Sequence, residues 1–123
     1  MAFDIEAARL NLRNREKARQ RQLDSLYERA VSDFEKIVSH LISKYDPIRI
    51  FQWGSLLHRE RFREWSDIDI ALEGLSHPLA GLSAASDAQE MTELPVDLVE
   101  LERIHPLNAQ SIRSDGRLVY ERQ

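Results

Sequence analysis

Two acidic residues flank an isoleucine at the head of the segment "DIDIALE", residues 67–73. The segment alternates polar and apolar residues, which is typical of a β-strand. Because residues two apart in a strand project from the same face, Asp67 and Asp69 place two carboxylates side by side. Carboxylates that close repel each other, and a bound hard divalent cation such as Mg²⁺ removes that cost. This pair is therefore a candidate metal site.

A third acid lies near the start of the segment "VDLVEL", residues 96–101, which we also predict to be a strand. If the two strands are neighbours, Asp97 lies next to Asp67 and Asp69 at the same end of the sheet. Three carboxylates can hold two metal ions roughly 3.5–4 Å apart, which is the spacing used for in-line phosphoryl transfer. A D-x-D pair alone is most often a solvated strand end, so the combination of acids carries the hypothesis.

A Gly-Ser pair follows the apolar segment "IRIFQW", residues 48–53, which we predict to be a strand. Glycine allows the backbone to approach a ligand closely, and the N-terminus of a following helix offers free N–H groups to an anion. Residues 54–62, "GSLLHRERF", are predicted to turn and enter a short helix with Ser55 near its N-cap. Gly54 and Ser55 are therefore candidate phosphate contacts, although Ser55 could serve only as a cap.

A long amphipathic helix must precede these strands. From residue 23 the apolar side chains form one stripe with charges opposite: Leu23, Leu26, Tyr27, Ala30, Val31, Phe34, Ile37, Val38, Leu41, Ile42 and Tyr45. The stripe weakens upstream, where the helix is expected to continue toward residue 5, and Pro47 ends it. Residues 13–21 hold five basic side chains and one acid. A solvated helix face is the favoured interpretation of this run, ahead of a phosphate or partner contact.

The remaining segments alternate between helices and strands. We predict a helix within residues 78–92, a helix over 105–116 that ends at Gly116, and a last strand over 117–121. The pattern indicates an α/β or α+β fold with helices packed on a sheet.

Composition limits the class of protein. The chain has 123 residues, a formal net charge of −4 and no cysteine. It has neither an apolar signal core nor a stretch of about 20 apolar residues. We therefore expect one soluble, cytoplasmic domain without disulfides, with no membrane association and no strong nucleic-acid signal. Its four glycines form neither a P-loop nor a dinucleotide-binding motif.

Gly54-Ser55, Asp67-Ile68-Asp69 and Asp97 within "VDLV" resemble the signature of the minimal nucleotidyltransferases of the DNA polymerase beta superfamily. The resemblance implies a mixed sheet flanked by helices, and transfer of a nucleoside monophosphate from ATP, with Mg²⁺, to a hydroxyl. It implies that Asp67 and Asp69 bind both metal ions, and that Asp97 binds the catalytic metal and helps to deprotonate the acceptor. Gly54 and Ser55 would hold the triphosphate. On this basis residues 1–22 are expected to be a helical arm and residues 23–123 the nucleotidyltransferase domain.

The basic phosphate contact departs from the family pattern. The family often has an arginine three residues after the serine, where this chain has His58, and the gap before Asp67 is one residue longer than usual. We favour Arg59 over His58, because a guanidinium group suits phosphate, and expect Arg61 and Arg63 to be solvated.

The surface that binds the acceptor is expected to come from another chain, another copy or the N-terminal arm, because residues 23–121 leave no second domain to bind it. Small members of this family resemble antitoxins encoded beside a HEPN-type ribonuclease toxin, which implies transfer of AMP to a hydroxyl of that partner. Two alternatives stay open: an antitoxin that neutralises its partner by binding alone, and a small-molecule nucleotidyltransferase of the aminoglycoside type. The N-terminal arm could dock on the partner or on a second copy of the chain, or it could equally be a partly frayed helix end.

Overall fold

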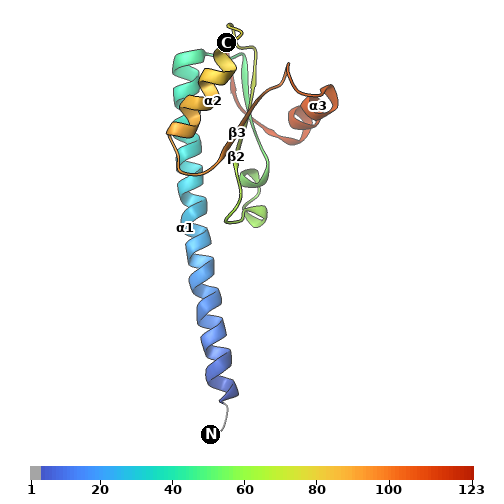
Figure 1. The fold of residues 1–123 in the computed structure, drawn as a ribbon. Helices are drawn as coiled ribbons and strands as arrows, with labels where there is room; N and C mark the ends of the chain where they lie inside the picture. Colours follow the sequence, from blue (N-terminus) through green and yellow to red (C-terminus); the bar gives the residue numbers. More distant parts are fainter. Residues whose placement is uncertain (1–3) are drawn as a thin grey trace.

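The computed structural model describes residues 4–123, which form a sheet with helices on both faces (Figure 1). Its elements in chain order are α1 (Ile5–Tyr45), β1 (Arg49–Trp53), η1 (Ser55–Leu57), η2 (Arg59–Arg61), β2 (Ile68–Glu73), α2 (Ala80–Glu90), β3 (Val96–Glu100), α3 (Pro106–Asp115) and β4 (Arg117–Glu121). Every helix and strand predicted outside residues 54–62 is confirmed, with boundary shifts of a few residues at most.

The four strands form a mixed sheet in the order β3-β2-β1-β4. Strand β1 is antiparallel to both β2 and β4, whereas β2 and β3 are parallel and are joined through α2. The two strands that carry the predicted acids are therefore neighbours. The parallel pairing also brings their N-terminal ends to the same edge of the sheet.

Helix α1 begins where the sequence predicts. The side chain of Asp4 accepts a hydrogen bond from the backbone N–H of Ala7 at 3.0 Å, which caps the first turn. The helix ends at Tyr45, where the following Asp46 adopts a left-handed conformation, with φ 42°, and Pro47 comes next.

None of the helices in residues 4–123 is long and apolar enough to cross a membrane.

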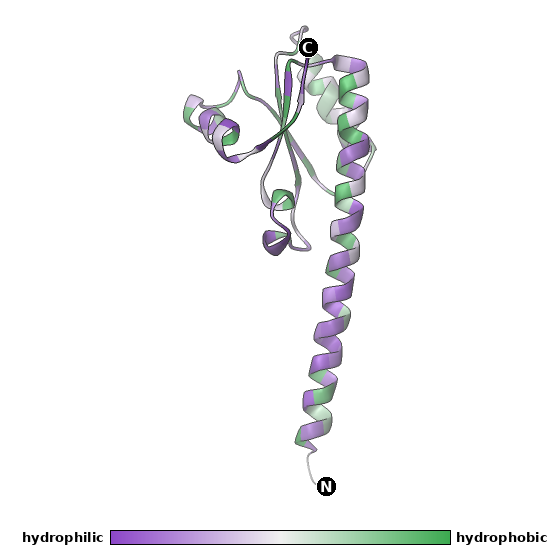
Figure 2. Ribbon diagram, turned by 180° about the vertical axis from the view of Figure 1, so that it is seen from behind, coloured by the Kyte–Doolittle hydropathy of each residue, from purple (hydrophilic) through white to green (hydrophobic). Residues whose placement is uncertain are grey.

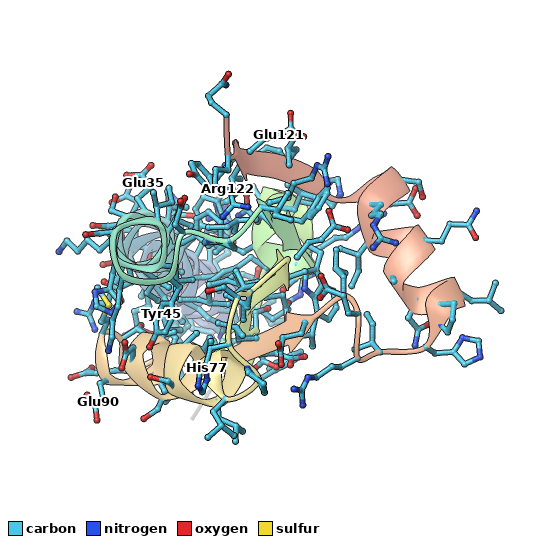
Figure 3. The ribbon with its side chains drawn as sticks, turned by 90° about the horizontal axis from the view of Figure 1, so that it is seen from above. Glu35, Tyr45, His77, Glu90, Glu121 and Arg122 are labelled. Atoms are coloured by element: carbon cyan, nitrogen blue, oxygen red, sulfur yellow. The ribbon has the colours of Figure 1, made fainter. Side chains whose placement is uncertain are left out.

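The apolar core divides between the two faces of the sheet. Helices α1 and α2 pack on the face that includes Ile68, Ile70 and Leu72. Helix α3 packs on the opposite face, against Phe51 and Ala71. Viewed from above, α1 and α2 lie on one side of the sheet and α3 on the other (Figure 3).

One polar cluster joins α1 to α2. Asp87 of α2 accepts hydrogen bonds from Lys44 and Tyr45, both at 2.8 Å, and its carboxylate lies 2.8 Å from Nε2 of His40. These hydrogen bonds, that with His40 first, hold the pKa of Asp87 well below its usual range. The cluster fixes the position of α2, and hence the crossover between β2 and β3.

The prediction of a helix over residues 54–62 is wrong in its type. The segment forms two separate 3₁₀ turns, η1 and η2, because His58 between them is extended, with φ −126° and ψ 106°. Gly54 occupies the cap position of η1, and Ser55, the first residue of the turn, makes no side-chain capping bond. The break matters because it changes the direction in which the basic residues after Ser55 point.

The N-terminal part of α1 extends far beyond the sheet, on the side where β1 ends (Figure 1). We call residues 5–22 the arm. Every residue of the arm is exposed except Ala8, which is half-buried. Coloured by hydropathy, the arm is mostly hydrophilic with separate apolar positions, whereas the later part of α1 is more apolar where it lies against the sheet (Figure 2).

Candidate active site

The three predicted acids meet at one edge of the sheet. Asp69 and Asp97 lie directly opposite each other in the parallel pairing of β2 with β3, and Asp67 immediately precedes β2. Because Ile68 and Ile70 pack into the core on the α1 side, Asp67 and Asp69 project to the opposite face. The sheet therefore places the three acidic residues at the same end of two neighbouring strands, as the spacing predicts.

The environment of Asp69 is unusual for a carboxylate. The residue is only 8% exposed. Its burial, together with the negative charges of Asp97 and Asp67, raises the pKa of Asp69 from 3.8 to about 7. Asp69 thus lies in the electrostatic field of the other two acids.

The donor set fits a hard divalent cation by its chemistry. Mg²⁺ takes oxygen ligands, and typically one or two carboxylates with waters and substrate phosphates in the remaining positions. As they stand, no three acidic or histidine side chains of the described chain are gathered tightly enough to hold a metal ion. The argument that Mg²⁺ fits this site therefore rests on the carboxylate ligands and their charge, and not on a preformed set of metal ligands.

Gly54 lies against the central acid. Its backbone has φ 80°, which favours glycine, and a Cβ at this position would overlap the carboxylate of Asp69. Trp53, which precedes it, pairs directly with Asp69 across β1 and β2. Its indole N–H is buried and makes no hydrogen bond within residues 4–123. The Gly-Ser turn is therefore in contact with Asp69.

That cavity has a volume of about 320 Å³ and adjoins the Gly-Ser turn. Gly54, Ser55, His58 and Arg61 line one side, and the C-terminal turn of α3 with Asp115 lines the other. His58 and Arg61 thus lie at the same cavity as Gly54 and Ser55, the predicted phosphate contacts.

Arg59 points elsewhere in this conformation. It forms an ion pair with Asp24 of α1, and its guanidinium lies 4.7 Å from the centre of the Tyr27 ring. Arg61, which sequence analysis treats as solvated, is exposed but lines the cavity. The sequence spacing alone does not show whether Arg59 or Arg61 lines the cavity. His58, which is extended, interrupts the helical geometry between Ser55 and these arginines.

The family follows from a comparison of the sequence with protein-family models. Residues 35–123 match the family described as "Polymerase beta, Nucleotidyltransferase". The chain belongs to this nucleotidyltransferase family. The match includes the Gly-Ser turn, the three aspartates and all four strands of the sheet.

Solved structures share the fold at low sequence identity. A chain in the crystal structure of the toxin-antitoxin MntA-HepT is 22% identical, with a TM-score of 0.56; the match covers 74% of this chain and 72% of that one. A second structure, of the toxin-antitoxin with AMP-PNP, is 24% identical with a TM-score of 0.59, covering 72% and 74%. No curated protein sequence matches this chain.

Proposed function

We propose that this nucleotidyltransferase moves AMP from ATP to a hydroxyl of a partner protein and thereby acts as the antitoxin of a toxin-antitoxin pair. The observation that carries the proposal is the position of three carboxylates beside a Gly-Ser turn and a cavity with basic side chains. Nucleotide transfer needs this combination, because the acids must face the reacting phosphate while the leaving group meets donors.

The order of the strands would place the acids and the Gly-Ser turn on opposite sides of the proposed reacting phosphate. Asp97 lies on the edge strand β3, Asp69 on β2, and the Gly-Ser turn follows β1. The acceptor hydroxyl would enter on the β3 side, where Asp97 is exposed and can take its proton. Its oxygen forms a bond to the α-phosphorus, while the bond from that phosphorus to the bridging oxygen breaks.

The leaving pyrophosphate would then lie on the β1 side. The Ser55 hydroxyl can donate to its oxygens, and Arg61 lies at the same cavity to balance its charge. His58 lines the cavity as well. Arg59, the contact that the sequence favours, would need to leave Asp24 before it could reach the phosphates.

Mg²⁺ bound by Asp67, Asp69 and Asp97 would supply a Lewis acid that polarises the phosphoryl oxygens and stabilises the charge that develops there. Binding would also offset the mutual repulsion of the three carboxylates, which Asp69 experiences most strongly because it is buried. The same acids that weaken the metal-free protein would thus hold the substrate complex together.

The partner class rests on similarity. Among the solved structures that share this fold, one is of the toxin-antitoxin MntA-HepT and another is of a toxin-antitoxin with AMP-PNP, an ATP analogue. A toxin of the HEPN type, encoded beside this chain, is accordingly the proposed acceptor.

A transfer assay tests the proposal. The protein is mixed with Mg²⁺, ATP labelled on its α-phosphate and the product of the neighbouring gene, and label on that product is measured after denaturing electrophoresis. Asp67→Asn and Asp97→Asn are expected to abolish labelling while the fold is retained. Glu90→Gln, which neutralises an exposed acid on α2, is the matched control and should transfer as the unaltered protein does.

Two results would contradict the proposal. A stable complex of the two proteins without label would indicate an antitoxin that acts by binding alone. Label on an added aminoglycoside, and none on the partner, would indicate a small-molecule nucleotidyltransferase.

A further inference from the structure

The stripe by which α1 packs on the sheet continues into the arm. Six positions alternate at intervals of four and three residues along this line: Ile5, Arg9, Leu12, Glu16, Arg19 and Leu23. This interval keeps the side chains on one side of a helix and is the spacing of helices that pair along their length. We call this line the arm seam.

The arm seam is uncovered in the single chain. Ile5 is 56% exposed and Leu12 is 60% exposed. Leu23, at its upper end, is partly buried and packs against the core. The exposed apolar positions of the seam thus lie on a helix that extends into solvent well away from the sheet (Figure 1).

The charged residues of the arm seam can form ion pairs with those of a second copy when the two arms are antiparallel. If two arms lie antiparallel so that Arg9 faces Glu16 of the second copy, two such ion pairs form across the two-fold axis. The same register brings Leu12 next to Leu12 of the second copy. A parallel pair would instead set Arg9 against Arg9 and Glu16 against Glu16, which is repulsive.

We propose that two copies of this chain associate through antiparallel packing of their arms along the arm seam. The overlap runs from residue 5 to residue 20 of each copy, or roughly 24 Å of helix at about 1.5 Å per residue. From residue 23 the rest of the molecule begins to cover α1, so this overlap lies within the exposed length of the arm.

A hollow beside the arm fits the end of the second arm. It has a volume of about 480 Å³ and lies between Gln20 and Leu23 of α1 and the loop that carries Trp65. Trp65 is 78% exposed, which is high for the largest apolar side chain. In the proposed register Ile5 of the second copy lies opposite Gln20, so it would enter this hollow and cover Trp65.

The charge pattern favours a second copy over an unrelated acidic partner. The arm as a whole holds six basic residues and two acids, which would suit an acidic helix. Along the seam, however, the signs alternate, so a uniformly acidic helix would meet Glu16 with a like charge. A second copy offers the opposite sign at Arg9 and at Glu16.

Sedimentation and cross-linking test the association and its register. The full chain should sediment with about twice its mass of 14.3 kDa. Because the chain has no cysteine, Leu12→Cys introduces a single thiol on the seam, and mild oxidation should convert most of the protein to a disulfide-linked dimer. Leu10→Cys is the matched control, since Leu10 is 56% exposed but lies on the other side of the helix, and it should cross-link little.

A charge exchange tests the ion pairs. Arg9→Glu and Glu16→Arg should each weaken the dimer roughly tenfold, and the double variant should restore it. Lys17→Glu makes the same change of charge away from the seam and should leave the dimer intact. A monomer at all concentrations, equal cross-linking at positions 10 and 12, or no restoration by the double variant would overturn the proposal. So would a monomer that binds acidic helical peptides. These outcomes do not depend on whether the protein transfers AMP.

Discussion

Replacement of Asp69 by asparagine should stabilise the metal-free protein while it abolishes transfer. Asp69 is buried beside two other acids, and its pKa is raised from 3.8 to about 7. A raised pKa means that the folded state holds the proton more tightly than the unfolded state does. Asp69 therefore stabilises the fold at low pH, and this contribution is lost as the pH rises through about 7.

The difference between the two pKa values corresponds to about 4 kcal/mol at about pH 8, where the folded protein must hold the charged carboxylate. Asparagine has nearly the same shape and carries no charge. Asp69→Asn should consequently raise the free energy of unfolding by up to about 4 kcal/mol at that pH in the presence of a chelator. Near pH 4 the gain should largely vanish, because the carboxyl is protonated in the folded state of the unaltered protein.

Urea unfolding of both proteins, followed by circular dichroism across this pH range, measures the effect. Glu90→Gln, which removes an exposed charge, should shift the unfolding free energy by less than about 0.5 kcal/mol. Added Mg²⁺ should stabilise the unaltered protein and have little effect on Asp69→Asn. Two results would contradict a raised pKa of Asp69: lower stability of Asp69→Asn at about pH 8 without metal, or the same effect of the substitution at both ends of the pH range.

Three other predictions concern the site and the fold. Arg61→Ala should weaken ATP binding, measured by calorimetry, by roughly tenfold or more, whereas Arg59→Ala should have a smaller effect; the reverse order would assign the phosphate contact to Arg59. Gly54→Ala should abolish transfer and destabilise the fold by on the order of 2 kcal/mol in urea unfolding, since its Cβ would overlap the Asp69 carboxylate; an active variant of unchanged stability would contradict this. The lowered pKa of Asp87 means that its contribution to stability is present near neutral pH and lost as the pH falls below about 4. The difference between the unaltered protein and Asp87→Asn should therefore shrink in acid, and a constant difference would be evidence against the hydrogen-bonded cluster.

The sequence predicts most of the fold because its elements are marked by local patterns. The stripe from Leu23 to Tyr45 defines the packed part of α1, and alternation in residues 67–73 defines β2. The meeting of Asp69 with Asp97 depends on β2 and β3 being neighbours, which the spacing suggests and the parallel pairing confirms.

The features of the site that the sequence does not predict depend on contacts between segments that are distant in the chain. The extended conformation of His58 divides residues 54–62 into two turns, so helical spacing does not apply there. Arg59 then meets Asp24, which lies 35 positions earlier in the chain, and Arg61 lines the cavity instead. The contribution of α3 to the cavity, through Asp115, likewise arises only when the helix folds back over the sheet.

Crystals grown with Mn²⁺, as a substitute for Mg²⁺, and a non-hydrolysable ATP analogue would show whether the three aspartates bind metal beside the triphosphate. Anomalous scattering locates the manganese without reference to activity or to a partner. We expect metal peaks bounded by Asp67, Asp69 and Asp97, with the triphosphate running from them toward Ser55. Nucleotide bound elsewhere, or bound at the Gly-Ser turn with no metal at the three aspartates, would contradict it.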